Sequence, residues 1–217
     1  MKILIVSATK FEVAPLLEQL RELRTNGRIT SGIYNAHEVN ILVTGIGMTA
    51  TAYYTGKVLN DSYDFALNLG VCGSFNKNLE IGSVVNVYED QFSELGAEDG
   101  DTFLSLADLK LEGVSKIHNN SGALHVEIEK LPKVNGITVN TVHGNEKSIE
   151  RIWSRYRPYI ESMEGAAFMF VCENERIPYV QIRAVSNFVE RRNKDAWNLP
   201  LAIQNLNSTV KNILDAL

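Results

Sequence analysis

Two glutamates, each at the start of a predicted helix, are the residues best suited to acid–base or sugar-binding chemistry. Glu12 follows an apolar segment, residues 3–7, and can act as a general base toward water. Glu164 precedes the small residues 165–167. Each also has a structural explanation, because Thr9 and Glu12 form a capping-box pattern and a carboxylate is favoured at any helix N-terminus. The local sequence leaves both explanations open.

Two glycine-containing turns after predicted strands could bring backbone close to a ligand. The first spans residues 44–47 and opens a helix, whose N-terminus can bind anionic groups. The second spans residues 70–73, where a tight turn without a ligand is an equally good explanation. Neither turn is a dinucleotide fingerprint or a Walker A loop. The candidate ligand contacts in the two turns are Ile46, Gly47, Val71, Cys72 and Gly73.

A third group of polar residues ends the predicted strand 179–186, where Arg183, Ser186 and Asn187 fall close together. Ligands of open α/β sheets gather at the carboxyl ends of strands. Asn187 also suits a simple turn after a strand, and Arg183 could form a structural ion pair. These alternatives stay open on the sequence alone.

Other catalytic chemistries find little support. No G-x-S-x-G elbow is present, and the four histidines stand singly. His143 could line a site, although a lone loop histidine is more often structural. No His/Asp/Glu cluster indicates a metal, and we expect neither a metal nor another cofactor.

Composition narrows the class of protein and its partners. The 217 residues carry a formal net charge of -5 and no basic cluster, which disfavours nucleic acid. The apolar N-terminal stretch is too short for a secretory signal or a membrane span. Cys72 and Cys172 lack metal-ligand spacing and are expected to be buried, reduced thiols. We therefore expect a cytoplasmic protein that does not associate with membranes.

The elements that must position these residues alternate between strands and helices, which predicts a single domain, residues 1–217, of three-layer α/β/α class. A helix from about residue 9 would place Phe11, Leu16, Leu20 and Leu23 on one face. Residues 93–120 are acidic, contain Gly and Ser, and are expected to form loops with short elements. The predicted strands are 3–7, 29–34, 38–44, 65–71, 83–92, 136–142 and 179–186, and the further helices are 47–59, 145–156, 165–175 and 202–217.

Taken together, these segments resemble the nucleoside phosphorylase/nucleosidase superfamily over nearly the whole chain. The matching stretches are Glu12 after the first strand and residues 44–47, 68–73, 79–85, 162–167 and 182–187. Futalosine hydrolases and bacterial methylthioadenosine/adenosylhomocysteine nucleosidases are the most similar families. The resemblance implies a mixed central sheet and a homodimer or larger homo-oligomer.

The resemblance also implies roles for individual residues. Glu12 matches the residue that activates water, and Met163 with Glu164 matches the pair that holds the ribose. Asn187, with Ser186, would meet the purine, and Arg183 would order this group. The base would lie near Thr141 and Val142, where Thr141 replaces a phenylalanine of the adenine-specific relatives.

Asn187 is a departure that bears on the substrate, because adenine-specific nucleosidases have an aspartate there. An amide can donate to N7 or O6 of a 6-oxopurine without being protonated. Futalosine hydrolases share the Ser186-Asn187 pair, an Arg191 to Trp197 stretch and a 95–99 run. The sequence therefore favours hydrolysis of futalosine to hypoxanthine and dehypoxanthine futalosine in menaquinone biosynthesis. Arg191 and Arg192 are candidates, on charge alone, for binding the substrate's carboxylate tail.

Three other functions stay open. The first is an adenine-specific nucleosidase, and Asn187 argues against it because those enzymes have an aspartate at this position. A 6-oxopurine nucleoside phosphorylase would need phosphate-binding arginines, which residues 7–12 and 45–50 lack. A nucleoside-binding module without activity is disfavoured by the presence of both Glu12 and Glu164.

Overall fold

A mixed ten-stranded sheet runs through residues 1–119 and 125–217, which are the residues that the computed structural model describes. Its strand order is β11-β10-β6-β12-β5-β1-β4-β3-β2, and β9 pairs with β6. The strands are β1 (Lys2–Ser7), β2 (Arg21–Asn26), β3 (Ile29–Tyr34), β4 (His37–Val43), β5 (Phe65–Ser74), β6 (Val84–Phe92), β9 (Lys116–His118), β10 (Lys133–Thr138), β11 (Ile160–Ser162) and β12 (Tyr179–Phe188). A separate hairpin pairs β7 (Gly96–Asp99) with β8 (Thr102–Ser105).

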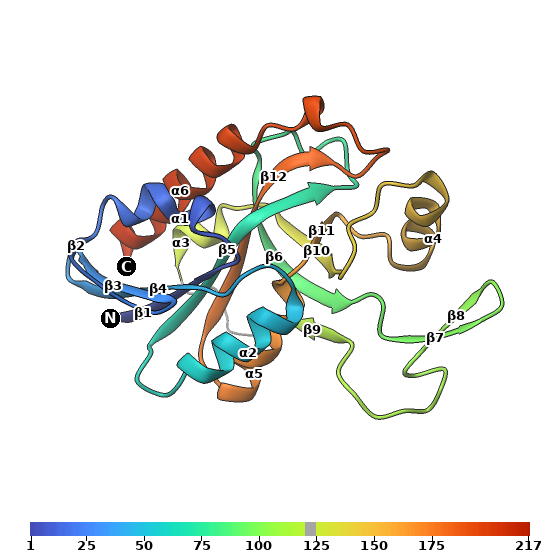
Figure 1. The fold of residues 1–217 in the computed structure, drawn as a ribbon, viewed down its shortest axis with the longest axis horizontal. Helices are drawn as coiled ribbons and strands as arrows, with labels where there is room; N and C mark the ends of the chain where they lie inside the picture. The colour runs from blue at the N-terminus through green and yellow to red at the C-terminus, as the bar shows by residue number, and fades with distance from the viewer. Residues whose placement is uncertain (120–124) are drawn as a thin grey trace.

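Helices cover both faces of this sheet (Figure 1). The helices α1 (Lys10–Leu17), α3 (Val126–Glu129) and α6 (Leu199–Ala216) lie on one face. On the other face α2 (Met48–Val58) packs against α5 (Gly165–Glu175). The helix α4 (Glu146–Tyr156) lies at one end of the molecule, and η1 (Lys194–Ala196) is a single 3-10 turn before α6. The predicted three-layer α/β/α class with a mixed central sheet is thereby confirmed.

Strand β1 shows why the sequence forms a sheet covered on both sides. Ile3 and Ile5 belong to the apolar core beneath α1 and α6, whereas Leu4 and Val6 belong to the core beneath α5. Successive side chains of a strand point to opposite faces, so a continuous apolar run must be buried on both. The parallel neighbours β4 and β5 then bring the polar carboxyl ends of three strands to one edge.

The carboxyl end of β5 lies between two other strands. β12 pairs with it in parallel on one side, and β11 pairs with it antiparallel on the other. Because β11 also pairs with β10, the path β5-β12-β6-β10-β11 returns to β5. This closure brings residues from distant parts of the sequence beside Gly73.

The predicted N-terminal helix is too long. Helix α1 ends at Leu17, and Leu23 lies in strand β2 with its side chain 50% exposed. Leu16 and Leu20 are buried as expected, but Phe11 is 77% exposed. Every residue of β2 is exposed, so this edge strand lacks the apolar alternation by which a strand is recognised.

Other predicted elements agree with the structure within a few residues, with three differences. The strand predicted at 136–142 ends at Thr138, which leaves residues 139–144 as a loop. The short elements β11 and α3 were not predicted. The predicted loop region 93–120 contains the β7–β8 hairpin and β9, and its last residue, Asn120, lies outside the described residues.

Two predictions from composition can be compared with the structure. Cys72 and Cys172 are both free and buried, as expected. Within residues 1–119 and 125–217, none of the helices has the length and apolar character needed to cross a bilayer.

Candidate active site

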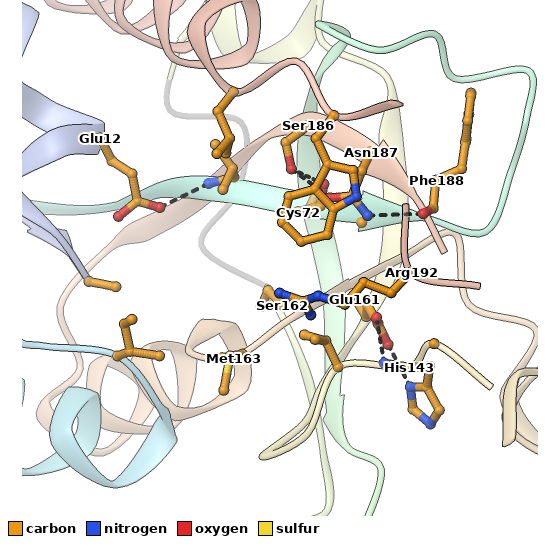
Figure 2. A pocket seen from close by; sticks show the side chains of 18 of the residues that line it. Glu12, Cys72, His143, Glu161, Ser162, Met163, Ser186, Asn187, Phe188 and Arg192 are labelled. Atoms are coloured by element: carbon orange, nitrogen blue, oxygen red, sulfur yellow. Dashed lines mark hydrogen bonds and ion pairs between the residues drawn. The ribbon is translucent and has the colours of Figure 1, made fainter. Parts of the chain in front are cut away.

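A cavity of about 660 Å³ opens at the carboxyl ends of β1, β5 and β12. Glu12 lies at one side of it, Met163 below, and Ser186 and Asn187 toward the other side (Figure 2). The floor is formed by Val71, Cys72 and Gly73 of β5. Segments that are far apart in the sequence therefore share one cavity, at the sheet edge where α/β proteins bind ligands.

The Glu12 carboxylate is buried and held by four hydrogen bonds. Its Oε2 accepts from the Ser7 hydroxyl at 3.0 Å, the Thr9 N–H at 2.9 Å and the Thr9 hydroxyl at 2.8 Å. Its Oε1 accepts from the Val71 N–H at 3.1 Å. The capping box is thus present, and the same carboxylate also lines the cavity. The two explanations of Glu12 left open by the sequence are compatible.

Glu164 is buried at the start of α5 and joins that helix to the first glycine turn. Its Oε1 accepts from the Gly47 N–H at 3.1 Å, and its Oε2 lies 3.8 Å from Nη1 of Arg183. Burial raises the pKa of Glu164 above its ordinary value, while the Arg183 guanidinium opposes this shift. Gly47 takes φ +100°, a conformation that strongly favours glycine.

Arg183 is fully buried behind the cavity rather than in its lining. Its Nη2 donates to Oδ1 of Asn68, and its Nη1 faces Glu164. Gly70 makes room for it, since a Cβ on Gly70 would lie 2.0 Å from Arg183 Nη1 and 3.0 Å from Glu12 Oε1. Arg183 is therefore an ion-pair partner of Glu164, which was one of the two explanations that the sequence left open.

A bulge in β12 directs Asn187 toward the cavity. Val185 pairs with Cys72 and Asn187 pairs with Gly73, so Ser186 is an extra residue in β12. Such bulges re-aim side chains near active sites. The Asn187 Oδ1 accepts from the Ser186 hydroxyl at 2.8 Å, and its Nδ2 donates to the Phe188 carbonyl at 2.9 Å. The amide is held in one orientation.

Glu161 is a polar residue of the cavity that was not predicted from the sequence, whereas its partner His143 was named as a residue that could line a site. The Glu161 carboxylate accepts from the His143 backbone N–H at 3.0 Å, and its other oxygen lies 2.6 Å from His143 Nδ1 (Figure 2). Glu161 is 3% exposed. Its position two residues before Met163 was the available indication, but the partner is 18 residues away and β11 was not predicted.

The structure brings most of the predicted site residues into one cavity. Glu12, Ile46, Val71, Cys72, Gly73, Val142, Met163, Glu164, Ser186 and Asn187 line it. Gly47 and Arg183 lie outside the lining and reach it through Glu164. Thr141 is exposed and also lies outside the lining, whereas the next residues of its loop, Val142 to Gly144, are part of it.

The electrostatics of the cavity suit a neutral nucleophile. Glu12 and Glu164 place two carboxyl groups at one side, which disfavours an anion such as phosphate there. Arg28, beside the 44–47 turn, donates to the Val43 and Thr44 carbonyls and lies over the Tyr54 ring. Burial raises the pKa of the Cys72 thiol to about 12, so it is unsuited to act as a thiolate nucleophile.

The family of the chain follows from a match over nearly its whole length. The family model described as the phosphorylase superfamily matches residues 2–217. The chain belongs to this superfamily.

Enzymes of two names are found among the curated relatives. The chain is 28% identical to a 5'-methylthioadenosine/S-adenosylhomocysteine nucleosidase of Bacillus subtilis (strain 168), with 86% of each chain covered. It is 27% identical to a futalosine hydrolase of Acidothermus cellulolyticus, with 94% of this chain and 87% of the relative covered.

The fold is shared with solved nucleosidase structures. A 5'-methylthioadenosine/S-adenosylhomocysteine nucleosidase from Colwellia psychrerythraea, in complex with adenine, superposes with a TM-score of 0.84. The two chains are 22% identical, and the match covers 99% of this chain and 95% of the other. This likeness establishes the nucleoside phosphorylase/nucleosidase fold.

Proposed function

We propose that this protein is an N-ribosyl hydrolase that cleaves a purine base from a nucleoside with water as the nucleophile. The observation that carries the proposal is that Glu12, Met163, Glu164 and Asn187 line one cavity. In the proposed reaction they act as a base, two sugar contacts and a purine contact, which are the groups that cleavage of a nucleoside requires. The relatives named nucleosidases support the same reaction class.

In the proposed reaction the C1′–N9 bond breaks and its electron pair leaves with the purine. Glu12 takes a proton from water as the water oxygen bonds to C1′. Glu164 binds the ribose hydroxyls, and Met163 covers the apolar face of the sugar. The Asn187 amide donates to the purine as negative charge develops on it, and the base then gains a proton from solvent.

We favour futalosine as the substrate, with hypoxanthine and dehypoxanthine futalosine as products in menaquinone biosynthesis. Asn187 supports a 6-oxopurine, because a neutral amide offers a permanent N–H donor to N7 or O6. The curated relatives include both a futalosine hydrolase and 5'-methylthioadenosine/S-adenosylhomocysteine nucleosidases by name. A methylthioadenosine/adenosylhomocysteine nucleosidase is therefore the second candidate.

Two further features stay predictions. Arg191 and Arg192 line the cavity, Arg192 lies over the Trp197 ring at 5.0 Å, and we expect the two arginines to bind the carboxylate tail of the substrate. We also expect a homodimer or larger homo-oligomer in the cytoplasm.

One assay tests the proposed function. Purified protein is incubated with futalosine, methylthioadenosine or inosine, each with and without phosphate, and the released base is identified chromatographically. Hypoxanthine from futalosine without phosphate is the expected result. Adenine release selects the second candidate, a requirement for phosphate selects a phosphorylase, and an absence of turnover selects a binding module.

A further inference from the structure

Gly73 is flanked on both sides by polar side chains of neighbouring strands. Asn187 of β12 is its partner on one side, and Glu161 of β11 is its partner on the other. A Cβ on Gly73 would lie 3.0 Å from Val189 Cγ2, 3.4 Å from Asn187 Nδ2 and 3.6 Å from Glu161 Cγ. Because Gly73 has no side chain, the amide and the carboxylate can both lie close to its backbone.

Asn187 and Glu161 belong to the two strands that flank β5. Neighbouring strands are about 4.8 Å apart, so the backbones of β11 and β12 are separated by about 10 Å across β5. All three residues line the cavity. A bicyclic base lying over Gly73 would have one edge toward Asn187 and the other toward Glu161.

The two flanking groups offer opposite hydrogen-bonding character. One N–H of Asn187 Nδ2 is bonded to the Phe188 carbonyl, and the other has no partner among residues 1–119 and 125–217, so it can donate to a ligand. The Glu161 carboxylate can only accept when ionised, and each oxygen keeps a free lone pair beyond its bond to His143. The cavity therefore presents a donor on one side and an acceptor on the other.

We propose that Glu161 selects a 6-oxopurine by accepting a hydrogen bond from the N1–H of the purine. This inference rests on the proposed function of the cavity as a nucleoside site. A 6-oxopurine matches the pair, since its N7 and O6 accept from Asn187 while N1–H donates to Glu161. In a 6-aminopurine of the same orientation, N1 carries no proton and faces the Glu161 carboxylate. Both groups are hydrogen-bond acceptors, so they repel each other. His143 is a positioning residue, because its N–H and Nδ1 fix the carboxylate with two bonds.

Binding of the free bases tests this assignment without requiring turnover. Calorimetry measures the Kd of hypoxanthine and of adenine for the wild type, Glu161→Gln and the control Glu150→Gln, which removes one exposed charge from α4. The wild type should prefer hypoxanthine. A hydrogen bond to a charged group sets the scale, so Glu161→Gln should lower the ratio of hypoxanthine to adenine affinity roughly 10- to 100-fold. Glu150→Gln should leave the ratio unchanged.

An equal loss of both bases in Glu161→Gln, or an unchanged ratio, overturns the assignment. If that variant does not fold, His143→Ala gives the second measurement and should weaken hypoxanthine alone, by roughly two- to tenfold. A wild type that binds neither base overturns both this inference and the proposed function. A wild type that selects hypoxanthine through Glu161 but hydrolyses no nucleoside overturns only the hydrolysis.

Discussion

Replacement of Glu12 by glutamine separates the chemical role of this carboxylate from its structural role. Glutamine keeps one oxygen, which can still accept from the donors of Ser7 and Thr9 that now bond Oε2. Its amide nitrogen would then face the Val71 N–H, so one buried backbone bond is lost. A buried donor left without a partner costs about 1–3 kcal/mol of stability. The variant should therefore fold, because domains are stable by about 5–15 kcal/mol.

The effect on catalysis should be larger. A general base contributes roughly 10²- to 10⁴-fold, so kcat for hypoxanthine release from futalosine should fall by that factor in Glu12→Gln. The Kd of hypoxanthine should be unchanged, because the proposed base site lies around Gly73. Initial rates in phosphate-free buffer and calorimetry give the two quantities.

The matched control for this variant is Glu18→Gln, which removes an exposed carboxylate at the end of the same helix. It should turn over like the wild type. Normal turnover by Glu12→Gln would refute the assignment of Glu12 as the base. An equal loss in Glu18→Gln would show that net charge, rather than the position of the carboxylate, is responsible.

Two further predictions concern residues that support the site. Gly70→Ala should lower the free energy of unfolding by about 3 kcal/mol or more, because its Cβ would displace the buried Arg183. The control Gly56→Ala should not lower it, because a Cβ there would meet only Val171, at 4.0 Å. Equal midpoints of urea unfolding for the two variants would contradict this prediction. Burial raises the pKa of Asp90 to about 7, so the folded protein holds this proton to a higher pH than the unfolded chain and should lose stability as pH rises from about 4 to 7. Asp90→Asn has no carboxyl to titrate and should not lose this stability. Between pH 5 and pH 8 its free energy of unfolding, measured by urea titration, should rise by about 2–3 kcal/mol relative to that of the wild type. A difference between the two proteins that does not depend on pH would refute the pKa shift.

Burial is the cause of the raised pKa of Asp90, and the hydrogen bonds of its neighbours oppose part of the shift. The Gln181 Nε2 donates to Asp90 Oδ2 at 2.7 Å, whereas Gln181 Oε1 is buried without a hydrogen-bond partner in the described parts of the chain. A protonated Asp90 has a hydroxyl, which can donate a hydrogen bond to an oxygen such as Gln181 Oε1. The neutral form is therefore favoured by burial and tolerated by its neighbours.

The elements with strong apolar patterns were predictable from the sequence, and those without such a pattern were not. Residues 3–7 are apolar throughout, and the structure buries them on both faces as β1. Arg21–Asn26 form an edge strand that is exposed at every position, so no periodicity distinguishes them from a helix or loop. Leu23 was assigned to the preceding helix for this reason.

The site was predictable where one residue sits at the end of one strong element. Glu12 follows the apolar strand β1, Asn187 lies near the end of the apolar strand β12, and both line the cavity. The Glu161–His143 pair depends on β11, three residues long, which takes its place through pairing with β5 and β10. Tertiary pairing of that kind leaves no local pattern in the sequence.

The extra residue in β12 is a second feature that the sequence does not reveal. Ser186 shifts the register between Val185 and Asn187, and this shift places Asn187 opposite Gly73. A strand without the bulge would turn Asn187 to the other face of the sheet. The orientation of the amide therefore had to come from the structure.

Hydrolysis by water is the central claim, and isotope labelling tests it most directly. Futalosine is converted in H₂¹⁸O with phosphate present, and the products are analysed by mass spectrometry. The account predicts free hypoxanthine and one ¹⁸O atom bonded to C1′ of the ribosyl product. A ribosyl 1-phosphate product, or the absence of ¹⁸O at C1′ when measured before exchange with solvent, would contradict it.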